Sequence, residues 1–442
     1  MRAAVLLFIM VVLTPLSFLM PFAGLLTFTW MSYVRPHEWA YDQSAKYSLA
    51  IVVVTILGFL VFELPRRIPP VAINLLLILL WVQLTLSTLM ARSTNFAMPK
   101  YQEYSKILFM ALLTTAMVTT EKRVWLILLV LLGSIGLVVA KSFVGIVIRG
   151  GNTKIYGVGG ALGDNNDIAL LLAMTIPILF YFSGAQEKWW LKWGFYALTL
   201  MSVIVTLFTY SRGGLLGMLV GIGMIILKSR YKTLTFVLVV LLAVPTWLVL
   251  PRSLKDRFLS IQGAEEKDKS AQQRLKVWGI SLEIIRDHPL MGVGIRNILL
   301  VTQRYSIPGG DVLVSHNAYL QMATDAGIPA LLLFLALIGV SWLRLRKTRG
   351  ILKIHAPDSP LIKYCHGMEA SLPAYMTSAI FASRQDLELF YLVVALASSM
   401  ILIARQYELE AEARDMAQKQ ALTRPRYLQP DFEPALAGGT GD

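Results

Sequence analysis

Three basic side chains lie in polar stretches of an otherwise apolar chain, and together they could break a phosphate-linked bond. They are Arg212, Arg274 and His316. An imidazole has an ordinary pKa of about 6.5, so it can accept or release a proton near neutral pH. A guanidinium presents a fork of donors that matches phosphate, and its charge stabilises the phosphate as it leaves. These residue types suit a reaction with a histidine base and a phosphate leaving group.

Each of the three residues also has a structural interpretation. His316 follows Ser315, which could cap a helix, and the imidazole could be a hydrogen-bonded polar group at the helix entrance. Arg212 precedes two glycines between apolar runs, where it could be a snorkelling or topology-setting charge. Arg274 opens an amphipathic stretch and could be a solvated surface charge. The residue types alone leave both interpretations open.

For the other basic residues of the same region, the sequence alone favours structural roles over a part in the chemistry. Arg296 and Arg304 suit solvated surface charges, and His288 before Pro289 suits helix termination. No cluster of His, Asp and Glu has the spacing of zinc ligands, and no Gly-Lys-Ser/Thr loop could cradle a phosphate. We therefore predict a reaction without metal or cofactor, in which side chains supply the positive charge.

An acid- and amide-rich stretch, residues 159–167, leads into an apolar run. Its sequence is Gly-Gly-Ala-Leu-Gly-Asp-Asn-Asn-Asp. The polar groups could bind sugar hydroxyls or orient a basic side chain. The alternative is that Asp164 or Asn165 caps the following helix.

The elements that must position these residues are membrane spans. Of 442 residues, 56% are hydrophobic and 15% are charged, against roughly 25% charged in soluble domains. Apolar runs near the length of about 20 residues that a span requires recur along the chain. They predict an all-α polytopic membrane protein with about twelve transmembrane helices and one long periplasmic loop domain that contains amphipathic helices. The runs lie near 3–33, 47–63, 71–90, 104–119, 124–141, 166–183, 193–210, 213–227, 233–250, 327–343, 367–383 and 388–404.

The first run, 3–33, is too long for one ordinary helix. Pro15 and Pro21 would break it, so it could form one span with a half-helix or two short spans. Met1-Arg2 before an apolar run resembles a signal peptide, but no convincing small-residue cleavage site follows. We expect an uncleaved first span.

Lysine and arginine in the short loops predict the orientation. Densely basic loops alternate with longer, sparsely charged loops, which cover 34–46, 91–103 and 142–165. By the positive-inside rule the dense loops are cytoplasmic. The polar excursion 251–325 then lies in the periplasm of a protein of the bacterial inner membrane. The net charge of +14 is explained by topology and contact with anionic lipids, and no fold signature for nucleic acid accompanies it.

The excursion divides the chain into four parts. We expect N-terminal transmembrane helices over 1–250, a periplasmic catalytic loop region over 251–325, C-terminal transmembrane helices over 326–404, and a largely disordered cytoplasmic tail over 405–442. Within the excursion, apolar residues recur at helical spacing and predict an amphipathic helix on the membrane surface, ended by Pro289. Those residues are Leu275, Trp278, Leu282 and Ile285.

Several motifs in this order resemble the O-antigen ligase and O-antigen polymerase superfamily. They are Tyr210-Ser211-Arg212-Gly213-Gly214, Gln273-Arg274-Leu275-Lys276-Val277-Trp278, His288-Pro289-Leu290-Met291-Gly292-Val293-Gly294 and Ser315-His316-Asn317-Ala318-Tyr319-Leu320. The resemblance covers about residues 155–345 in detail. Arg35-Pro36-His37 and Gly163-Asp164-Asn165-Asn166 are similar to a branch described as exosortase-associated O-glycosylation ligases.

The resemblance implies an integral-membrane glycosyltransferase. Its donor would be a glycan on undecaprenyl pyrophosphate, and its acceptor in the ligase branch a hydroxyl of lipid A–core oligosaccharide. Two arginines and a histidine on the outer side are the family's key residues, and the matching positions are Arg212, Arg274 and His316. For substrate binding we expect Tyr210, Asn317, Asp164, Asn165 and Arg296 to contribute beside the two catalytic arginines.

Two alternatives stand beside the ligase. The same donor could serve a protein hydroxyl, as in a protein O-oligosaccharyltransferase, or another repeat unit, as in a polymerase. A lipid or solute transporter is a different class, and it predicts ionisable residues at mid-membrane and two related halves. The sequence has few charges inside the spans and no such halves.

Overall fold

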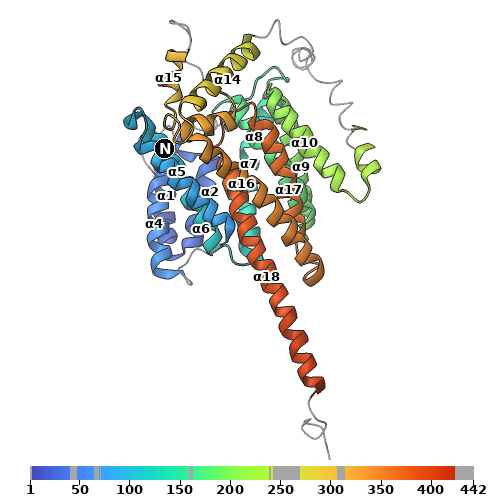
Figure 1. Ribbon diagram of the computed structural model, residues 1–442. Coiled ribbons are helices and arrows are strands. Elements are labelled where there is room, and N and C mark those ends of the chain that lie inside the picture. The colour runs from blue at the N-terminus through green and yellow to red at the C-terminus, as the bar shows by residue number, and fades with distance from the viewer. Residues whose placement is uncertain are drawn as a thin grey trace, which may run out of the picture.

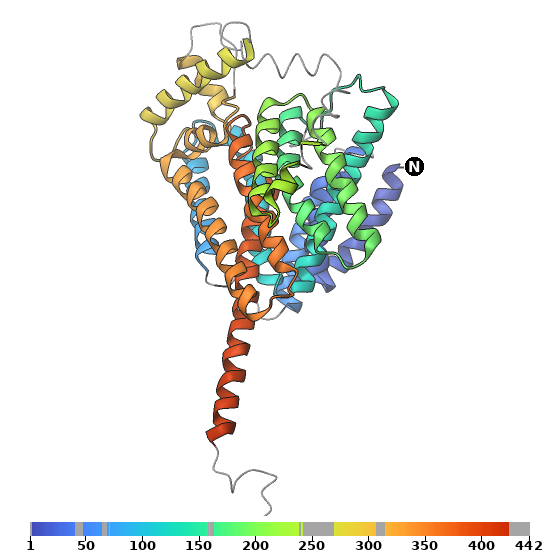
Figure 2. The same ribbon diagram turned by 90° about the vertical axis from the view of Figure 1, so that its right-hand side faces the viewer.

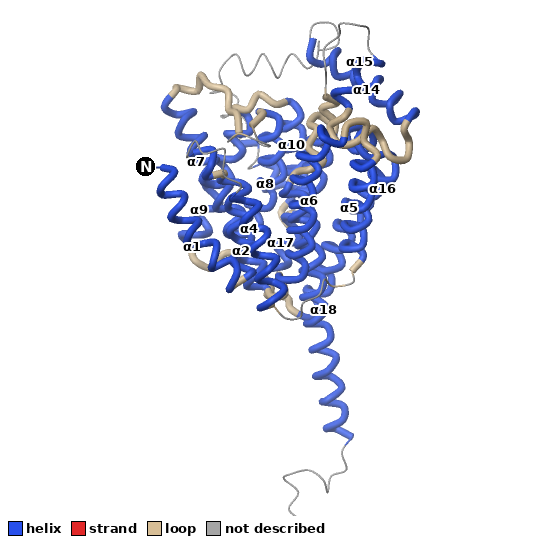
Figure 3. Tube along the Cα trace, turned by 90° about the vertical axis from the view of Figure 1, so that its left-hand side faces the viewer, coloured by secondary structure: helices blue, strands red, loops and turns tan. Residues whose placement is uncertain are grey.

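The computed structural model describes residues 2–39, 47–63, 69, 71–157, 159, 163–237, 240–241, 269–305 and 314–423. Every regular element within these ranges is a helix, as the tube in Figure 3 shows. Most of the helices form one bundle, and the all-α prediction is confirmed for this part of the chain. The predicted run 233–250 lies largely outside the described residues.

The N-terminal run folds as two helices that break at Pro21, whereas the predicted break at Pro15 is absent. Helix α1 (Arg2–Leu19) contains Pro15 without ending there, and α2 (Pro21–Val34) begins with its proline at the first position. That position tolerates proline, because the missing N–H has no partner within the helix. A four-residue helix, α3 (Pro36–Trp39), follows, and α1 and α2 both pack on α4 (Tyr47–Phe62).

Nine longer helices complete the bundle in the described chain. They are α5 (Ala72–Leu89), α6 (Thr94–Met117), α7 (Glu121–Ile148), α8 (Asn165–Gly184), α9 (Trp189–Leu207), α10 (Arg212–Lys228), α16 (Ala318–His355), α17 (Leu361–Ala379) and α18 (Glu388–Thr423). Helix α8 packs against α9, α10 and α17, whereas α16 packs against α5, α17 and α18. Helix α18 continues through 405–423, the first part of the predicted cytoplasmic tail.

Six of the described helices, not about twelve, are long and apolar enough to cross a membrane: α5, α7, α8, α9, α16 and α18. Helices α1 and α4 contain apolar stretches, Ala4–Leu19 and Tyr47–Phe62, that are too short to meet the same standard. Helix α10 has 17 residues, and α6 carries Lys100, Glu103 and Lys106. The apolar parts of α1, α4 and α10 are therefore too short to count among the six, and α6 is too charged. The chain is a multi-pass membrane protein.

The loops that were predicted to be periplasmic lie together at one end of the bundle, which we name the outer end after that prediction. Backbone hydrogen bonds join Arg92 N to Val293 O (3.2 Å) and Ile155 N to Phe208 O (2.9 Å). At the other end, Arg123 pairs with Glu63 (2.6 Å), and Lys363 donates to the carbonyl of Gly184 (2.7 Å). These contacts segregate the loops into two sets, in agreement with the alternation predicted from their charges.

The excursion forms a small helical cap on the outer end. Helices α14 (Lys269–Asp287) and α15 (Ile298–Tyr305) lie at one end of the molecule, and α18 projects from the opposite end (Figures 1 and 2). A second small core joins the two cap helices and the turn between them: Ile280, Ile284, Val293, Ile298 and Val301. The part of the excursion at 251–268 lies outside the described residues.

The buried face of α14 differs from the predicted face. Val277, Ile280 and Ile284 are buried, whereas Leu275 and Leu282 are 61% and 59% exposed. The helix has two apolar faces, and packing on α15 and α16 buries the face that the hydrophobic spacing had not singled out.

Small residues let α10 approach α8 and α17 closely. A Cβ on Gly214 would lie 2.3 Å from Ala169 Cβ, and a Cβ on Gly217 would lie 2.7 Å from the carbonyl oxygen of Ala374. Backbone atoms cannot move aside as a flexible side chain can. Close glycine contacts of this kind are typical of helix packing in membranes, and they fix the position of Arg212 at the start of α10.

Gly217→Ala is therefore expected to lower the thermal unfolding temperature of the detergent-solubilised protein. Overpacking costs about 1–3 kcal/mol, and the usual gain of roughly 1 kcal/mol from alanine in a helix offsets only part of it. Gly223→Ala on the same helix is the control, because no atom lies within 4 Å of its added Cβ. Equal unfolding temperatures for the two variants would contradict the close packing.

Candidate functional site

Arg212 begins α10 at the outer end of a tight hairpin. The hydroxyl of Ser211 caps the helix by accepting from Gly214 N (3.2 Å). Ser211 in turn donates to Asn166 Oδ1 (2.8 Å), which ties the hairpin to the first turn of α8. Tyr210 has a left-handed backbone with φ of 59°. Side-chain hydrogen bonds of Ser211 thus hold the hairpin that presents Arg212.

The stretch at 163–167 caps α8, as its structural interpretation predicted. Asp164 accepts from Asn166 N (2.7 Å) and is the N-cap. Asn165 is 6% exposed and donates to the carbonyl of Thr209 (2.9 Å). Asn165 is therefore used in joining α8 to the Arg212 hairpin, and Asp164 keeps a carboxylate at the outer surface.

His316 lies in a short extended segment between the cap and α16. Its backbone is left-handed, with φ of 45°. The helix begins at Ala318 and is capped by Asn317, whose side chain accepts from Tyr319 N (2.9 Å) and Leu320 N (3.1 Å). Ser315, the residue predicted to cap this helix, lies too far before it. Asn317 caps because its side chain reaches the first free N–H groups of the helix.

The indole of Trp278 holds this segment against α14. Trp278 Nε1 donates to the carbonyl of Ser315 (2.8 Å), the residue before His316. Arg274 lies about one helical turn before Trp278 on the same helix. The cap helix therefore brings Arg274 and His316 to the same place.

The charges around His316 favour its neutral form. Burial lowers the pKa of the imidazole, the positive charge of Arg274 lowers it further, and the negative charge of Asp164 opposes both. A neutral imidazole at physiological pH is the form that can accept a proton. The sequence-predicted residues His316, Arg274 and Asp164 thus interact electrostatically, although they come from three separate segments.

Asp325 organises the segment next to His316, and the sequence did not single it out. Its carboxylate is 3% exposed and accepts from Arg296 N (3.1 Å), Gln321 Nε2 (2.8 Å) and Gln385 Nε2 (3.2 Å). Arg296 has a left-handed backbone with φ of 62°. Its backbone thus serves this network, while its guanidinium lies over the ring of Phe96. Arg304 lies in α15.

Four non-glycine residues of the described chain have a positive φ: Arg35, Tyr210, Arg296 and His316. Such backbone strain costs about 1–3 kcal/mol per residue and gathers at functional sites. Three of the four were candidates from the sequence, and all four lie at the outer end of the bundle. This end is therefore where the protein maintains strained geometry.

The loop between α17 and α18, residues 380–387, connects the hairpin and the His316 segment. Arg384 faces Asp167 (3.9 Å) beside the Arg212 hairpin and Asp386 (3.5 Å) within its own loop. Ser383 Oγ lies 3.2 Å from Ser315 Oγ. The motifs singled out in the sequence do not include this loop. Its polar run Ser-Arg-Gln-Asp between two apolar helices is the signal by which it could have been found.

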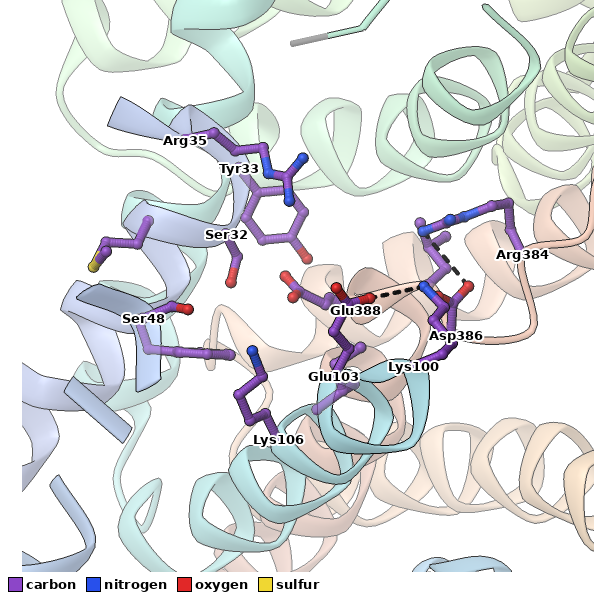
Figure 4. Close-up of a pocket in the computed structure, with 14 residues that line it drawn as sticks. Ser32, Tyr33, Arg35, Ser48, Lys100, Glu103, Lys106, Arg384, Asp386 and Glu388 are labelled. Carbon is purple, nitrogen blue, oxygen red and sulfur yellow. Dashed lines mark hydrogen bonds and ion pairs between the residues drawn. The ribbon is translucent and has the colours of Figure 1, made fainter. Parts of the chain in front are cut away.

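A polar cavity of about 230 Å³ opens beside this loop. Side chains converge on it from α2, α4, α6 and the start of α18 (Figure 4). Lys100 Nζ lies 2.6 Å from Asp386 Oδ2. Burial would raise the pKa of Asp386, but the charges of Arg384 and Lys100 outweigh that effect and lower it to about 2. The cavity wall therefore holds fixed charges of both signs.

Among the described residues, no group of three or more His, Cys, Asp and Glu side chains is arranged to hold a metal ion. The positive charges at this end come from arginine and lysine.

A bundle of apolar helices that carries a cap, a half-buried histidine and several arginines at one end defines a multi-pass membrane protein with a polar site at that end. Residues 196–335 match the family described as O-antigen ligase, and residues 1–187 match a family of unknown function. The first match supports an O-antigen ligase-like superfamily, and with it an enzyme. No curated protein matches the chain.

Proposed function

We propose that this protein is an O-antigen ligase of the bacterial inner membrane. It transfers a glycan from undecaprenyl pyrophosphate to a hydroxyl of lipid A–core oligosaccharide on the periplasmic side. The observation that carries the proposal is that Arg212, Arg274 and His316 all fall within the matched residues 196–335. The mutual influence of His316 and Arg274 supports the same assignment.

The residue types fit an inverting transfer. The acceptor oxygen attacks the anomeric carbon of the donor, and the bond from that carbon to the pyrophosphate oxygen breaks. His316 takes the proton of the acceptor hydroxyl, and its lowered pKa keeps it ready to do so. Arg212 and Arg274 bind the departing pyrophosphate, whose charge grows as the bond breaks. No metal is needed for this step if the guanidinium groups supply the positive charge.

Glycan transfer by purified protein tests the proposal directly. The reaction contains undecaprenyl-pyrophosphate-linked O-antigen, rough lipopolysaccharide and EDTA. A ladder of glycosylated lipopolysaccharide is the expected product. Absence of that product from protein that still binds the donor would reject the lipid A–core acceptor, and a protein substrate or a second repeat unit in the same assay would identify the alternative acceptor.

The pH dependence of transfer follows from the surroundings of His316. Because burial and Arg274 lower the pKa of His316, the acid limb of kcat/KM should lie below the ordinary histidine value of about 6.5. Activity is present above that limb and is lost as His316 becomes protonated. Asp164→Asn removes a charge that raises the pKa, so the limb should move to lower pH, while asparagine can still cap α8.

Asp287→Asn is the matched control for this shift. Asp287 is exposed at the end of α14 and accepts from the hydroxyl of Tyr305 (2.7 Å). Its substitution should leave the acid limb in place. An acid limb that moves to higher pH in Asp164→Asn would contradict the assignment of the limb to His316.

A further inference from the structure

The cavity beside the α17–α18 loop is built from parts of the chain that lie outside the O-antigen ligase match. Ser32, Tyr33 and Arg35 come from the end of α2, and Ser48 comes from α4. These residues, with Lys100, Glu103 and Lys106 of α6, belong to residues 1–187, the part that matches a family of unknown function. Arg384, Asp386 and Glu388 complete the wall. The ligase match therefore leaves this cavity unassigned.

We propose that this cavity is a saccharide-binding subsite that holds one sugar residue of a substrate glycan. This inference rests on the proposed function in one respect, namely that the glycan belongs to the donor or to the acceptor of the transfer. The wall offers cationic donors, carboxylate acceptors and hydroxyl groups within a space of about 230 Å³. A sugar hydroxyl both donates and accepts hydrogen bonds, so a ring that carries several hydroxyls suits such a mixed lining.

The lining carries charges of both signs, and two of its cations are already paired with carboxylates. The basic side chains are Arg35, Lys100, Lys106 and Arg384, and the carboxyl groups are Glu103, Asp386 and Glu388. Lys100 is committed to Asp386 (2.6 Å) and Glu103 (3.0 Å), and Arg384 is committed to Asp386 and Asp167. The charges of the lining therefore nearly cancel, and such a lining suits a polar ligand of low net charge better than a pyrophosphate, which brings several negative charges.

Tyr33 gives an independent indication of a ligand. Its side chain is 4% exposed, and its hydroxyl has no hydrogen-bond partner among the described residues. Tyr33 lines the cavity, as the close-up shows (Figure 4). A buried hydroxyl without a partner costs about 1–3 kcal/mol. A sugar hydroxyl in the cavity would satisfy this group.

The wall of the cavity also contacts the segments that position the transfer residues. Arg35 Nη1 donates to the carbonyl of Gly159, in the stretch that leads to Asp164. Arg384 faces Asp167 next to the Arg212 hairpin. From the same loop, Gln385 donates to Asp325 in the network next to His316. A glycan held at His316 could therefore extend into the cavity with a neighbouring sugar residue.

Tyr33→Phe tests the subsite with little structural change. Two free saccharides are used as probes: core oligosaccharide released from rough lipopolysaccharide, and O-antigen polysaccharide released from smooth lipopolysaccharide. Binding to protein in nanodiscs is measured by calorimetry. One of the two should bind the wild type and bind Tyr33→Phe about tenfold more weakly. Binding of the core would identify the acceptor as the occupant, and binding of the O-antigen would identify the donor glycan.

Two further variants sharpen the result. Ser48→Phe places a bulky ring in the cavity and should abolish saccharide binding. Tyr101→Phe is the control. Tyr101 is on the same helix as Lys100 but does not line the cavity, and its hydroxyl contacts that of Thr85 (2.7 Å). Tyr101→Phe should bind as the wild type does. The unfolding temperature of Tyr33→Phe should not fall, since an unpartnered buried hydroxyl contributes no stability.

The binding experiment separates failure of the subsite from failure of the proposed function. If neither saccharide binds the wild type, the subsite is rejected whatever the transfer assay gives. It is also rejected if Tyr33→Phe and Ser48→Phe bind the saccharide with the affinity of the wild type. A weaker affinity of Tyr33→Phe for sugar-free undecaprenyl pyrophosphate would also reject it, because the cavity would then hold phosphate or lipid. Saccharide binding without glycan transfer would retain the subsite and reject the ligase.

Discussion

His316→Ala is expected to reduce glycan transfer by about 10²–10⁴-fold, the usual contribution of a general base. The affinity for the undecaprenyl-pyrophosphate donor should remain, because the imidazole acts on the acceptor hydroxyl and not on the pyrophosphate. The measurement is product formation at saturating donor, together with donor binding to the same preparation. A strong loss of donor binding would instead make His316 part of the donor site.

His288→Ala is the matched control. His288 is exposed at the end of α14, at the same end of the molecule, and it suits termination of that helix. Its substitution should leave transfer within a factor of about two. Equal losses in the two histidine variants would show a general effect on the cap and would contradict a base at His316.

Arg212→Gln is expected to lower transfer by about 10²–10³-fold, the effect of removing one preorganised donor to a developing negative charge. It should also weaken binding of sugar-free undecaprenyl pyrophosphate, because this arginine is proposed to hold the pyrophosphate before and after the bond breaks. Glutamine keeps much of the length of the side chain, so the hairpin capped by Ser211 should fold as before. Binding is measured in nanodiscs with the sugar-free lipid.

Arg149→Gln supplies the comparison for Arg212. Arg149 is exposed at the outer end of α7, where it donates to Thr153 (3.2 Å). Loss of this surface charge should change lipid pyrophosphate binding little. An unchanged affinity of Arg212→Gln for the same lipid would remove Arg212 from the pyrophosphate site.

The sequence by itself determined the helices and the end of the bundle at which the polar residues gather. Runs of apolar residues correspond to helices because the helical backbone satisfies its own hydrogen bonds in an apolar environment. The cap at Asp164 and the end of α14 before Pro289 follow from local chemistry at helix ends. The motifs around Arg212, Arg274 and His316 likewise consist of neighbouring residues, so they could be read before any packing was known.

Only the tertiary structure decided which of these groups meet. Arg274 and Asp164 act on His316 because α14 packs on α16 and because the segment before α8 lies at the same end. The residue that caps α16 is Asn317 and not Ser315, a difference of two positions that depends on where the chain turns. Periodicity could not choose between the two apolar faces of α14, since the choice depends on the neighbour that covers it.

The saccharide cavity is the clearest example of a feature that no sequence pattern predicts. Tyr33, Lys100 and Asp386 lie far apart along the chain, and no local pattern relates them. Their approach depends on how α2, α6 and the start of α18 pack together. Once these groups are buried, water no longer hydrogen-bonds to them, so each needs a partner within the protein or in a ligand.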